Sequence, residues 1–94
     1  MWPDVLVLLM GYWVYMLQCG DGTLYTGSTT DPTRRLAVHQ SGKGAKYTRS
    51  RLPVQLVYQE ETANKSTALR REAAIKKLSR EEKLQLILTA KTDD

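Results

Sequence analysis

Short apolar segments separated by turn-forming residues dominate the first part of the chain and predict β-strands. Residues 12–19 are rich in aromatic and other β-forming side chains, which is typical of a strand. A glycine-containing turn at 20–22 leads into residues 23–28, the predicted return strand of a hairpin. Pro53 precedes a third predicted strand over residues 54–58.

The segment between the second and third predicted strands carries the signals of a helix. Asp31 followed by Pro32 is typical of an N-cap and a first helical position. The helix is expected to run to about Ser41, because Gly42 is suited to the residue that follows a helix end. Residues 42–46 are rich in glycine and are expected to form a mobile connection.

The last third of the chain predicts two further helices. The first should begin near Asn64 or Ser66, and its apolar residues recur at helical spacing and are expected to pack inward: Leu69, Ala73, Ile75 and Leu78. Ser79 and Glu82 form a capping box that starts the second helix, which is expected to carry three apolar side chains inward: Leu84, Ile87 and Leu88. Together these elements predict an α+β fold, a three-stranded antiparallel sheet flanked by helices.

The length of 94 residues predicts one domain, with three segments: 1–11 as an N-terminal extension, 12–90 as the folded domain and 91–94 as a frayed C-terminus. The longest apolar run, at 5–17, has 13 residues, whereas a membrane-spanning helix needs about 20, so no membrane partner is expected. The single cysteine, Cys19, cannot form an internal disulfide, which favours a reducing, cytoplasmic location.

Basic residues are concentrated in the middle of the chain, although the net charge is only +4. Residues 34–59 contain six bases and no acid, and this block is suited to attract the phosphates of a nucleic acid. The alternative is a solvated surface without a partner. The bases of the block are Arg34, Arg35, Lys43, Lys46, Arg49 and Arg51.

Two tyrosines of the predicted hairpin are candidates for chemistry. If the loop has three residues, positions 15 and 27 pair, as do 17 and 25, and Tyr15 and Tyr25 lie on one face, roughly 5–8 Å apart. A two-residue loop would place the two rings on opposite faces of the hairpin. Tyrosines at such positions are also common packing residues, so the pair alone does not establish a site.

Three further residues join the candidates. Arg35 and His39 are four residues apart and project from one face of the first predicted helix, which is also typical of an exposed basic surface. Glu72 lies on the predicted inward stripe of a later helix, where a carboxylate needs a partner that offsets its desolvation. That partner is a cation at a site, a set of hydrogen bonds, or an ion pair with one of three nearby bases: Arg70, Arg71 or Lys76.

The order of these residues resembles that of the GIY-YIG nuclease domain over about residues 12–88. The matching motifs are Trp13-Val14-Tyr15, Tyr25-Thr26-Gly27, Arg35 with His39, and Glu72. Residues 41–51 are similar to the short stand-alone bacterial members of that family. The resemblance implies metal-dependent hydrolysis of DNA phosphodiesters, with DNA as the partner and RNA as a further possibility.

The resemblance also implies a role for each matched residue. The tyrosine matching Tyr15 is the favoured general base, and the tyrosine matching Tyr25 positions it. Arg35 matches the arginine that faces the scissile phosphate, and His39 matches an active-site histidine of variable role. Glu72 matches the glutamate that holds one Mg²⁺ or Mn²⁺ ion.

The sequence leaves three functions open. The first is a divalent-metal-dependent DNA endonuclease acting on branched, damaged or single-stranded DNA. The second is a nucleic-acid-binding module of the same fold, without catalysis or dependent on a protein partner. The third is a small structural or interaction protein whose basic block is only solvated. Selectivity in the first case would come from the basic block or from a protein partner.

Overall fold

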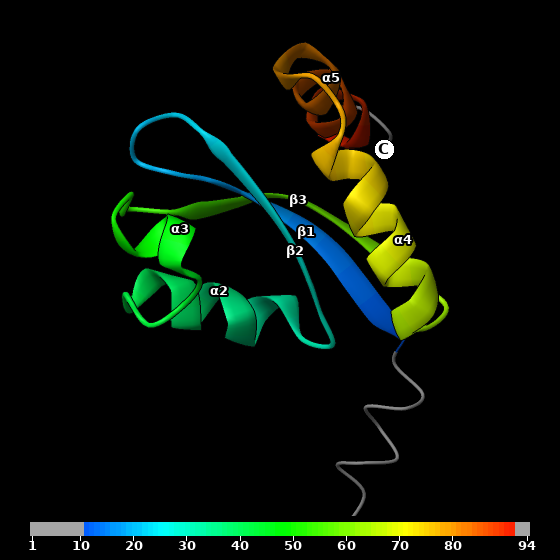
Figure 1. Cartoon of the computed structure of the whole chain (residues 1–94), viewed down its shortest axis with the longest axis horizontal. Helices are drawn as coiled ribbons and strands as arrows, with labels where there is room; N and C mark the ends of the chain where they lie inside the picture. Colours follow the sequence, from blue (N-terminus) through cyan, green and yellow to red (C-terminus); the bar gives the residue numbers. More distant parts are fainter. Residues whose placement is uncertain (1–10, 92–94) are drawn as a thin grey trace, which may run out of the picture.

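The protein folds into a three-stranded antiparallel sheet with helices on both faces, and a computed structural model describes its residues 11–91 (Figure 1). The predicted fold class is confirmed. The elements in chain order are β1 (Tyr12–Gln18), β2 (Leu24–Thr29), α2 (Pro32–Gln40), α3 (Lys46–Arg49), β3 (Gln55–Thr62), α4 (Lys65–Lys76) and α5 (Arg80–Lys91).

Strand β1 lies in the centre of the sheet, with β2 on one side and β3 on the other. The hairpin has the register expected of the three-residue loop, because Tyr15 pairs with Gly27 and Leu17 pairs with Tyr25. Gly22, in the turn, has a φ of 84°, a conformation that glycine adopts without strain. The two tyrosines therefore lie on the same face of the sheet, as predicted.

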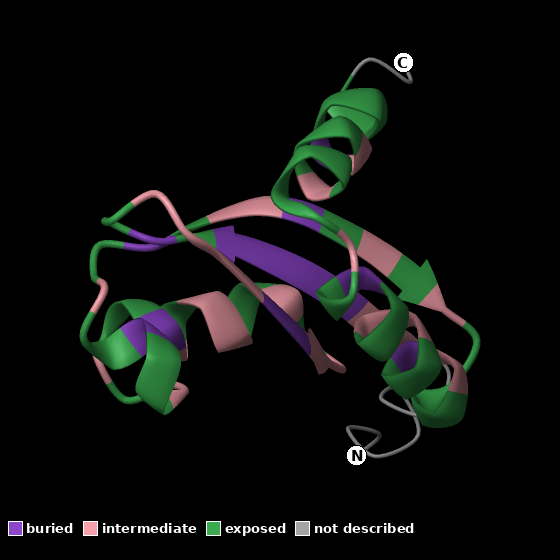
Figure 2. Ribbon diagram, turned by 45° about the horizontal axis from the view of Figure 1, so that its top comes forward, coloured by how far each residue is buried: buried purple, intermediate pink, exposed green. Residues whose placement is uncertain are grey.

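Alternate residues of β1 contribute to two separate apolar cores, and Figure 2 shows the buried positions running along this strand. Val14 and Met16 pack on the side of α4 and α5, against Ala68, Ile75 and Ile87. The other face of β1 forms the second core with α2 and the start of β3, and its members are Tyr15, Leu17, Cys19, Val54 and the half-buried Tyr25, Leu36 and Leu56. Two of the catalytic candidates, Tyr15 and Tyr25, therefore also pack in the second core.

The predicted helix boundaries are confirmed by their caps. The carboxylate of Asp31 accepts a hydrogen bond from the Arg34 amide at 3.1 Å, and Asn64 caps α4 in the same way. Ser79 and Glu82 form the reciprocal bonds of a capping box at the start of α5. Gly42 follows α2 with a φ of 81°.

The inward faces of α4 and α5 differ from the prediction. Leu69, Leu84 and Leu88 are exposed by 48%, 43% and 56%, and Ala73 is exposed as well. Ile75 and Ile87 are buried and Leu78 is half-buried, as predicted. The inward face of α4 also contains Ala68, half-buried Arg71 and half-buried Glu72, of which Glu72 was expected there. Helical spacing gives the separation of inward positions but not their phase, and here two charged residues with ionic partners take inward positions.

Two segments have more regular structure than predicted. β3 continues through Thr62, because Gln59–Thr62 pair with the first four residues of β1 despite their polar side chains. Residues 46–49, where the expected mobile connection ends, form the short helix α3.

The two predicted terminal segments lie mostly outside the described residues. Of the predicted N-terminal extension, only Gly11 is described. Of the predicted frayed C-terminus, only Lys91 is described, and it belongs to α5. Among the residues that are described, no helix has the length and apolar character needed to cross a bilayer.

Candidate active site

The hydroxyl of Tyr15 lies directly against β2, at the residue where the tyrosine pairs across the hairpin. A Cβ atom added to Gly27 would lie 2.5 Å from the Tyr15 hydroxyl oxygen, so only glycine fits opposite this side chain. The rings of Tyr15 and Tyr25 are 6.4 Å apart between centroids. In the sequence motif Tyr25-Thr26-Gly27, Tyr25 thus supplies the second phenol, and Gly27 leaves the space that the Tyr15 phenol requires.

His39 lies behind the two tyrosines and is fully buried. Its ring centroid is 5.3 Å from that of Tyr25 and 6.0 Å from that of Tyr15. Nε2 of His39 is 2.9 Å from the hydroxyl oxygen of Tyr15, and Nδ1 is 2.8 Å from Oγ1 of Thr48. Because no part of His39 reaches solvent, its contact with any substrate would be through Tyr15.

A polar pocket of about 290 Å³ opens in front of Tyr15. Four of the five catalytic candidates line it: Tyr15 from β1, Tyr25 from β2, Arg35 from α2 and Glu72 from α4. Ser28, Thr29 and Thr30 contribute hydroxyl groups to the same wall. In Figure 1, α2 and α4 flank β2 from opposite sides, so residues far apart in the sequence meet beside this strand. His39 is the one candidate that does not line the pocket.

Glu72 is held by two contacts at the edge of this pocket, with its side chain 16% exposed. Oε1 accepts a hydrogen bond of 2.7 Å from the Ser28 hydroxyl. Oε2 is 2.8 Å from Nζ of Lys76, one helical turn further along α4. Of the three bases considered from the sequence, Lys76 is thus the ion-pair partner, whereas Arg71 pairs with Glu60 of β3.

The donor set suits a magnesium ion that keeps most of its own water. The described residues contain no cluster of three or more histidine, cysteine, aspartate or glutamate side chains placed to hold a metal. Mg²⁺ is commonly bound by one or two carboxylates together with waters and substrate phosphates. Glu72 supplies one carboxylate beside a pocket with room for those waters, so the residues present fit the ion.

The phenol of Tyr15 is neutral in the resting site. Burial raises its pKa to about 12, and the opposing effect of the nearby Arg35 guanidinium is smaller. A tyrosine with such a pKa cannot act as a preformed phenolate at neutral pH. If Tyr15 accepts a proton from water, it must pass its own proton to a neighbour, and the hydrogen-bonded Nε2 of His39 is within reach.

Burial lowers the pKa of His39, and the positive charge of Arg35 lowers it further. The ordinary value is about 6.5, so the ring is neutral at pH 7 and available as a proton acceptor. His39 is the one histidine of the sequence, so any histidine titration of the protein belongs to this site.

The free energy of unfolding should therefore decrease as the pH falls from 7 to 5. Because the pKa of His39 is lower in the folded chain than in the unfolded chain, the unfolded chain binds more of a proton there in this window, so acidification favours unfolding, by at most about 1.4 kcal/mol per pH unit. Urea titrations at closely spaced pH values measure the effect. His39→Gln should have a flatter profile over this range. An identical slope in that variant would contradict the assignment to His39.

The predicted nucleic-acid-binding residues differ in exposure and in their contacts. Arg34 on α2, Lys43, and Lys46 and Arg49 on α3 are exposed. Arg51 instead pairs with Asp21 of the hairpin turn at 3.1 Å, and its guanidinium lies 3.8 Å from the centroid of the Tyr47 ring. The segment 34–59 contains no acidic residue, but in the fold one of its bases, Arg51, is paired with the carboxylate of Asp21.

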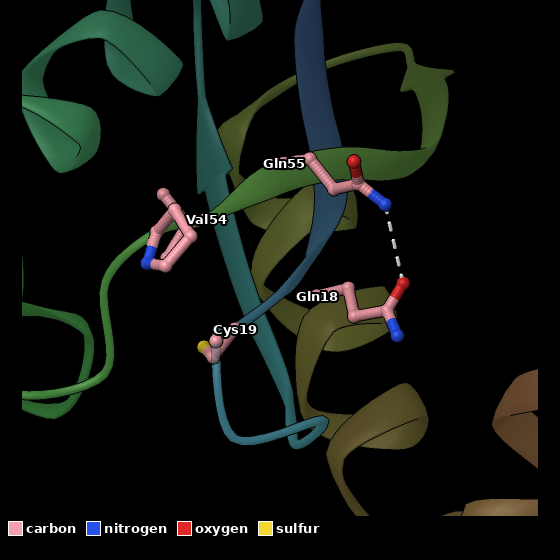
Figure 3. Close-up of a pocket in the computed structure, with 6 residues that line it drawn as sticks. Gln18, Cys19, Val54 and Gln55 are labelled. Carbon is pink, nitrogen blue, oxygen red and sulfur yellow. Dashed lines mark hydrogen bonds between the residues drawn. The ribbon is translucent and has the colours of Figure 1, made fainter.

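A second hollow, of about 210 Å³, lies at the hairpin end of the sheet and is lined by Gln18, Gln55 and the neighbouring residues 19–20 and 53–54. Figure 3 shows these two side chains facing one another across neighbouring strands, joined by a hydrogen bond of 3.3 Å. Cys19 is part of its wall and is buried, and burial raises the pKa of its thiol. This hollow contains none of the catalytic candidates.

Some residues that contact the candidates were not singled out from the sequence, among them Ser28 and Thr48. Ser28 donates to Glu72, and Thr48 contacts His39. Ser28 follows the Tyr25-Thr26-Gly27 motif directly, so its position in the strand could have indicated a role. Thr48 lies in a segment without strand or helix periodicity and outside any motif, so neither its position nor its residue type indicated a role.

Several known proteins are similar to this chain over most of their length. A UPF0213 protein of Streptococcus sanguinis is 59% identical over 75 residues, covering 80% of this chain and 86% of that protein. The solution NMR structure of a UPF0213 protein from Bacillus halodurans is 51% identical, with a TM-score of 0.53 and coverage of 81% of each chain. The NMR structure of an E. faecalis protein is 44% identical, with a TM-score of 0.58 and coverage of 86% of each chain. Residues 11–85 match the family model of the GIY-YIG catalytic domain, and the chain therefore belongs to the GIY-YIG family, together with short bacterial UPF0213 proteins.

Proposed function

We propose that this protein is a divalent-metal-dependent endonuclease that hydrolyses phosphodiester bonds of DNA. The observation that carries the proposal is the single pocket lined by Tyr15, Tyr25, Arg35 and Glu72. Membership of a nuclease family supports a nucleic-acid substrate. The pocket combines a proton-transfer group, a cation for phosphate and a carboxylate for a metal ion, which are the parts that phosphodiester hydrolysis needs.

In the proposed reaction, a water molecule loses a proton to the hydroxyl oxygen of Tyr15 and attacks the phosphorus. The hydroxyl proton of Tyr15 moves at the same time to Nε2 of His39, 2.9 Å away. Tyr15 therefore never becomes a free phenolate, which its pKa of about 12 would disfavour. The bond from phosphorus to the leaving oxygen breaks, and that oxygen takes a proton from solvent.

Arg35 and Glu72 act on the phosphate from opposite sides of the pocket. The guanidinium of Arg35 pairs with the phosphate oxygens, which gain negative charge as the water attacks. Tyr25 packs against His39 and keeps the Tyr15 ring in place. Glu72 would hold a Mg²⁺ or Mn²⁺ ion, whose positive charge would stabilise the leaving oxygen.

The proposed substrate is branched, damaged or single-stranded DNA. The exposed bases of α2, α3 and the loop between them, Arg34, Lys43, Lys46 and Arg49, are suited to phosphates, and contacts to phosphates carry no sequence information. Selection by the shape of the DNA is therefore favoured over selection by sequence. RNA and a protein partner that confers selectivity are the alternatives.

A cleavage assay on the purified protein tests the proposal. Labelled duplex, flap, junction and single-stranded DNAs, with a single-stranded RNA alongside, are incubated with Mg²⁺, Mn²⁺ or a chelator. Metal-dependent strand cleavage of at least one DNA is the expected result. Binding without cleavage under every metal would reject the endonuclease and favour the non-catalytic binding module. Cleavage confined to RNA would overturn the proposed substrate.

A further inference from the structure

Thr48 forms the inner end of a chain of buried hydrogen bonds that begins at Tyr15. The side chains of Thr48 and His39 are fully buried, and Tyr15 is 2% exposed. Oγ1 of Thr48 lies 2.9 Å from the carbonyl oxygen of Ala45, to which it donates, and 2.8 Å from Nδ1 of His39. A hydroxyl has one hydrogen, so a hydroxyl that donates to Ala45 can only accept from His39.

The direction of this bond decides which nitrogen of His39 carries the proton. A neutral imidazole has one N–H. With Nδ1–H donated to Thr48, Nε2 is an acceptor for the Tyr15 hydroxyl, and three hydrogen bonds form in one direction, of which the two to His39 are buried and the one to Ala45 is partly buried. In the other tautomer, Thr48 donates to Nδ1 and Nε2–H donates to Tyr15, which leaves two. The arrangement with three bonds is favoured because buried polar groups are stabilised by the bonds they form.

The backbone around Gly44 fits closely over the same imidazole. A Cβ atom at Gly44 would lie 2.2 Å from Nδ1 of His39, so no larger residue fits without displacing the ring. The loop and α3 therefore approach His39 from the side opposite Tyr15. This contact leaves the Thr48 hydroxyl as the polar group next to Nδ1.

We propose that Thr48 is a positioning residue of the active site, which holds His39 as the Nδ1–H tautomer so that Nε2 can accept the proton of Tyr15. This inference rests on the proposed endonuclease function. In the step, water gives one proton to Tyr15, and Tyr15 gives one proton to Nε2. Tyr15 ends neutral, water becomes hydroxide and His39 becomes an imidazolium. Both of its N–H groups then have acceptors, Tyr15 and Thr48, until the proton returns to solvent.

The tautomer of His39 can be measured directly by ¹⁵N NMR on the unmodified protein, because the sequence contains one histidine. The two nitrogen shifts of a neutral imidazole differ for protonated and unprotonated nitrogen, so the spectrum identifies the tautomer. The expected result is protonation at Nδ1. Protonation at Nε2 would overturn the proposal, whether or not the protein cleaves DNA.

Two variants test the contribution of the hydroxyl. Thr48→Val has nearly the same shape but no hydroxyl, and it should lose the preference for Nδ1–H and cleave DNA about tenfold more slowly. Thr48→Ser keeps the hydroxyl and should retain both the tautomer and most of the rate. A Thr48→Val protein with the parental tautomer and parental rate would overturn the proposal. If the unmodified protein cleaves no substrate, the endonuclease is rejected, and the NMR result still decides whether Thr48 sets the tautomer.

Discussion

Glu72→Gln should lose metal-dependent cleavage by about 100-fold or more while remaining folded and able to bind DNA. The carboxylate is the group in the pocket that can hold a divalent ion, and such an ion commonly contributes several kcal/mol to transition-state stabilisation. Glutamine can still accept the hydrogen bond of Ser28. DNA binding should be unchanged or stronger, because a negative charge is removed near the phosphates. Initial cleavage rates over a Mg²⁺ titration and DNA binding in chelator measure the two effects.

Lys76→Gln is the matched control for this variant. It removes the other half of the ion pair but keeps the carboxylate, and Lys76 is 53% exposed, so its loss should cost little stability. We expect cleavage to be retained and metal binding to be as strong as in the parent or stronger. Parental cleavage by Glu72→Gln would refute the metal assignment. If Glu72→Gln and Lys76→Gln both unfold, the main role of Glu72 is the structural ion pair.

Tyr15→Phe should reduce the rate of cleavage by about 10²–10⁴-fold, the range typical for loss of a general base. The substitution removes one oxygen and leaves Nε2 of His39 without its hydrogen-bond partner. The cost of that unsatisfied nitrogen is about 1–3 kcal/mol, so the melting temperature should fall by several degrees without loss of the fold. Single-turnover rates at saturating metal, measured well below the melting temperature, separate the chemical effect from stability.

Tyr58→Phe is a suitable control because it also removes the hydroxyl of a buried tyrosine. Tyr58 lies in the other core, where its hydroxyl donates to Glu60 of the same strand. It should cleave at close to the parental rate. A Tyr15→Phe protein that retains more than about a tenth of the parental rate would show that Tyr15 is not the base.

The hairpin is the part of the site that could be predicted most fully from the sequence. A loop of three residues fixes the register, and the register then fixes which side chains share a face. The distance of 6.4 Å between the Tyr15 and Tyr25 rings lies within the range expected from that register. What the register could not show is that the Tyr15 hydroxyl points at the position of Gly27. That contact depends on a side-chain rotamer.

The helices were predicted well at their ends and less well on their faces. Capping residues act locally, so Asp31, Asn64 and Ser79 could be recognised from the sequence alone. Which face packs inward depends on the partner surface, and the sequence placed Leu69 and Leu84 inward although both are exposed. Glu72 was correctly expected at the edge of the core, and its contact with Ser28 became visible only in the structure.

The basic segment was the hardest to predict, because its order depends on contacts made far away in the sequence. The short helix α3 has four residues, too few for a periodic pattern. It is placed by Thr48, which bonds to His39 of α2, and by the pairing of Arg51 with Asp21 of the hairpin turn. None of these partners is recognisable from the local composition.

The division of the protein into two cores has a consequence for its behaviour on warming. Tyr15 and Tyr25 belong to the core under α2, whereas Val14 and Met16 belong to the core under α4 and α5. Local opening of the α2–α3 layer would admit water around Tyr15 and His39, while the sheet and the other core remain packed. The catalytic arrangement therefore depends on the stability of one layer. Amide hydrogen exchange in α2 and α3 would report the fraction of molecules able to react more directly than the global melting temperature does.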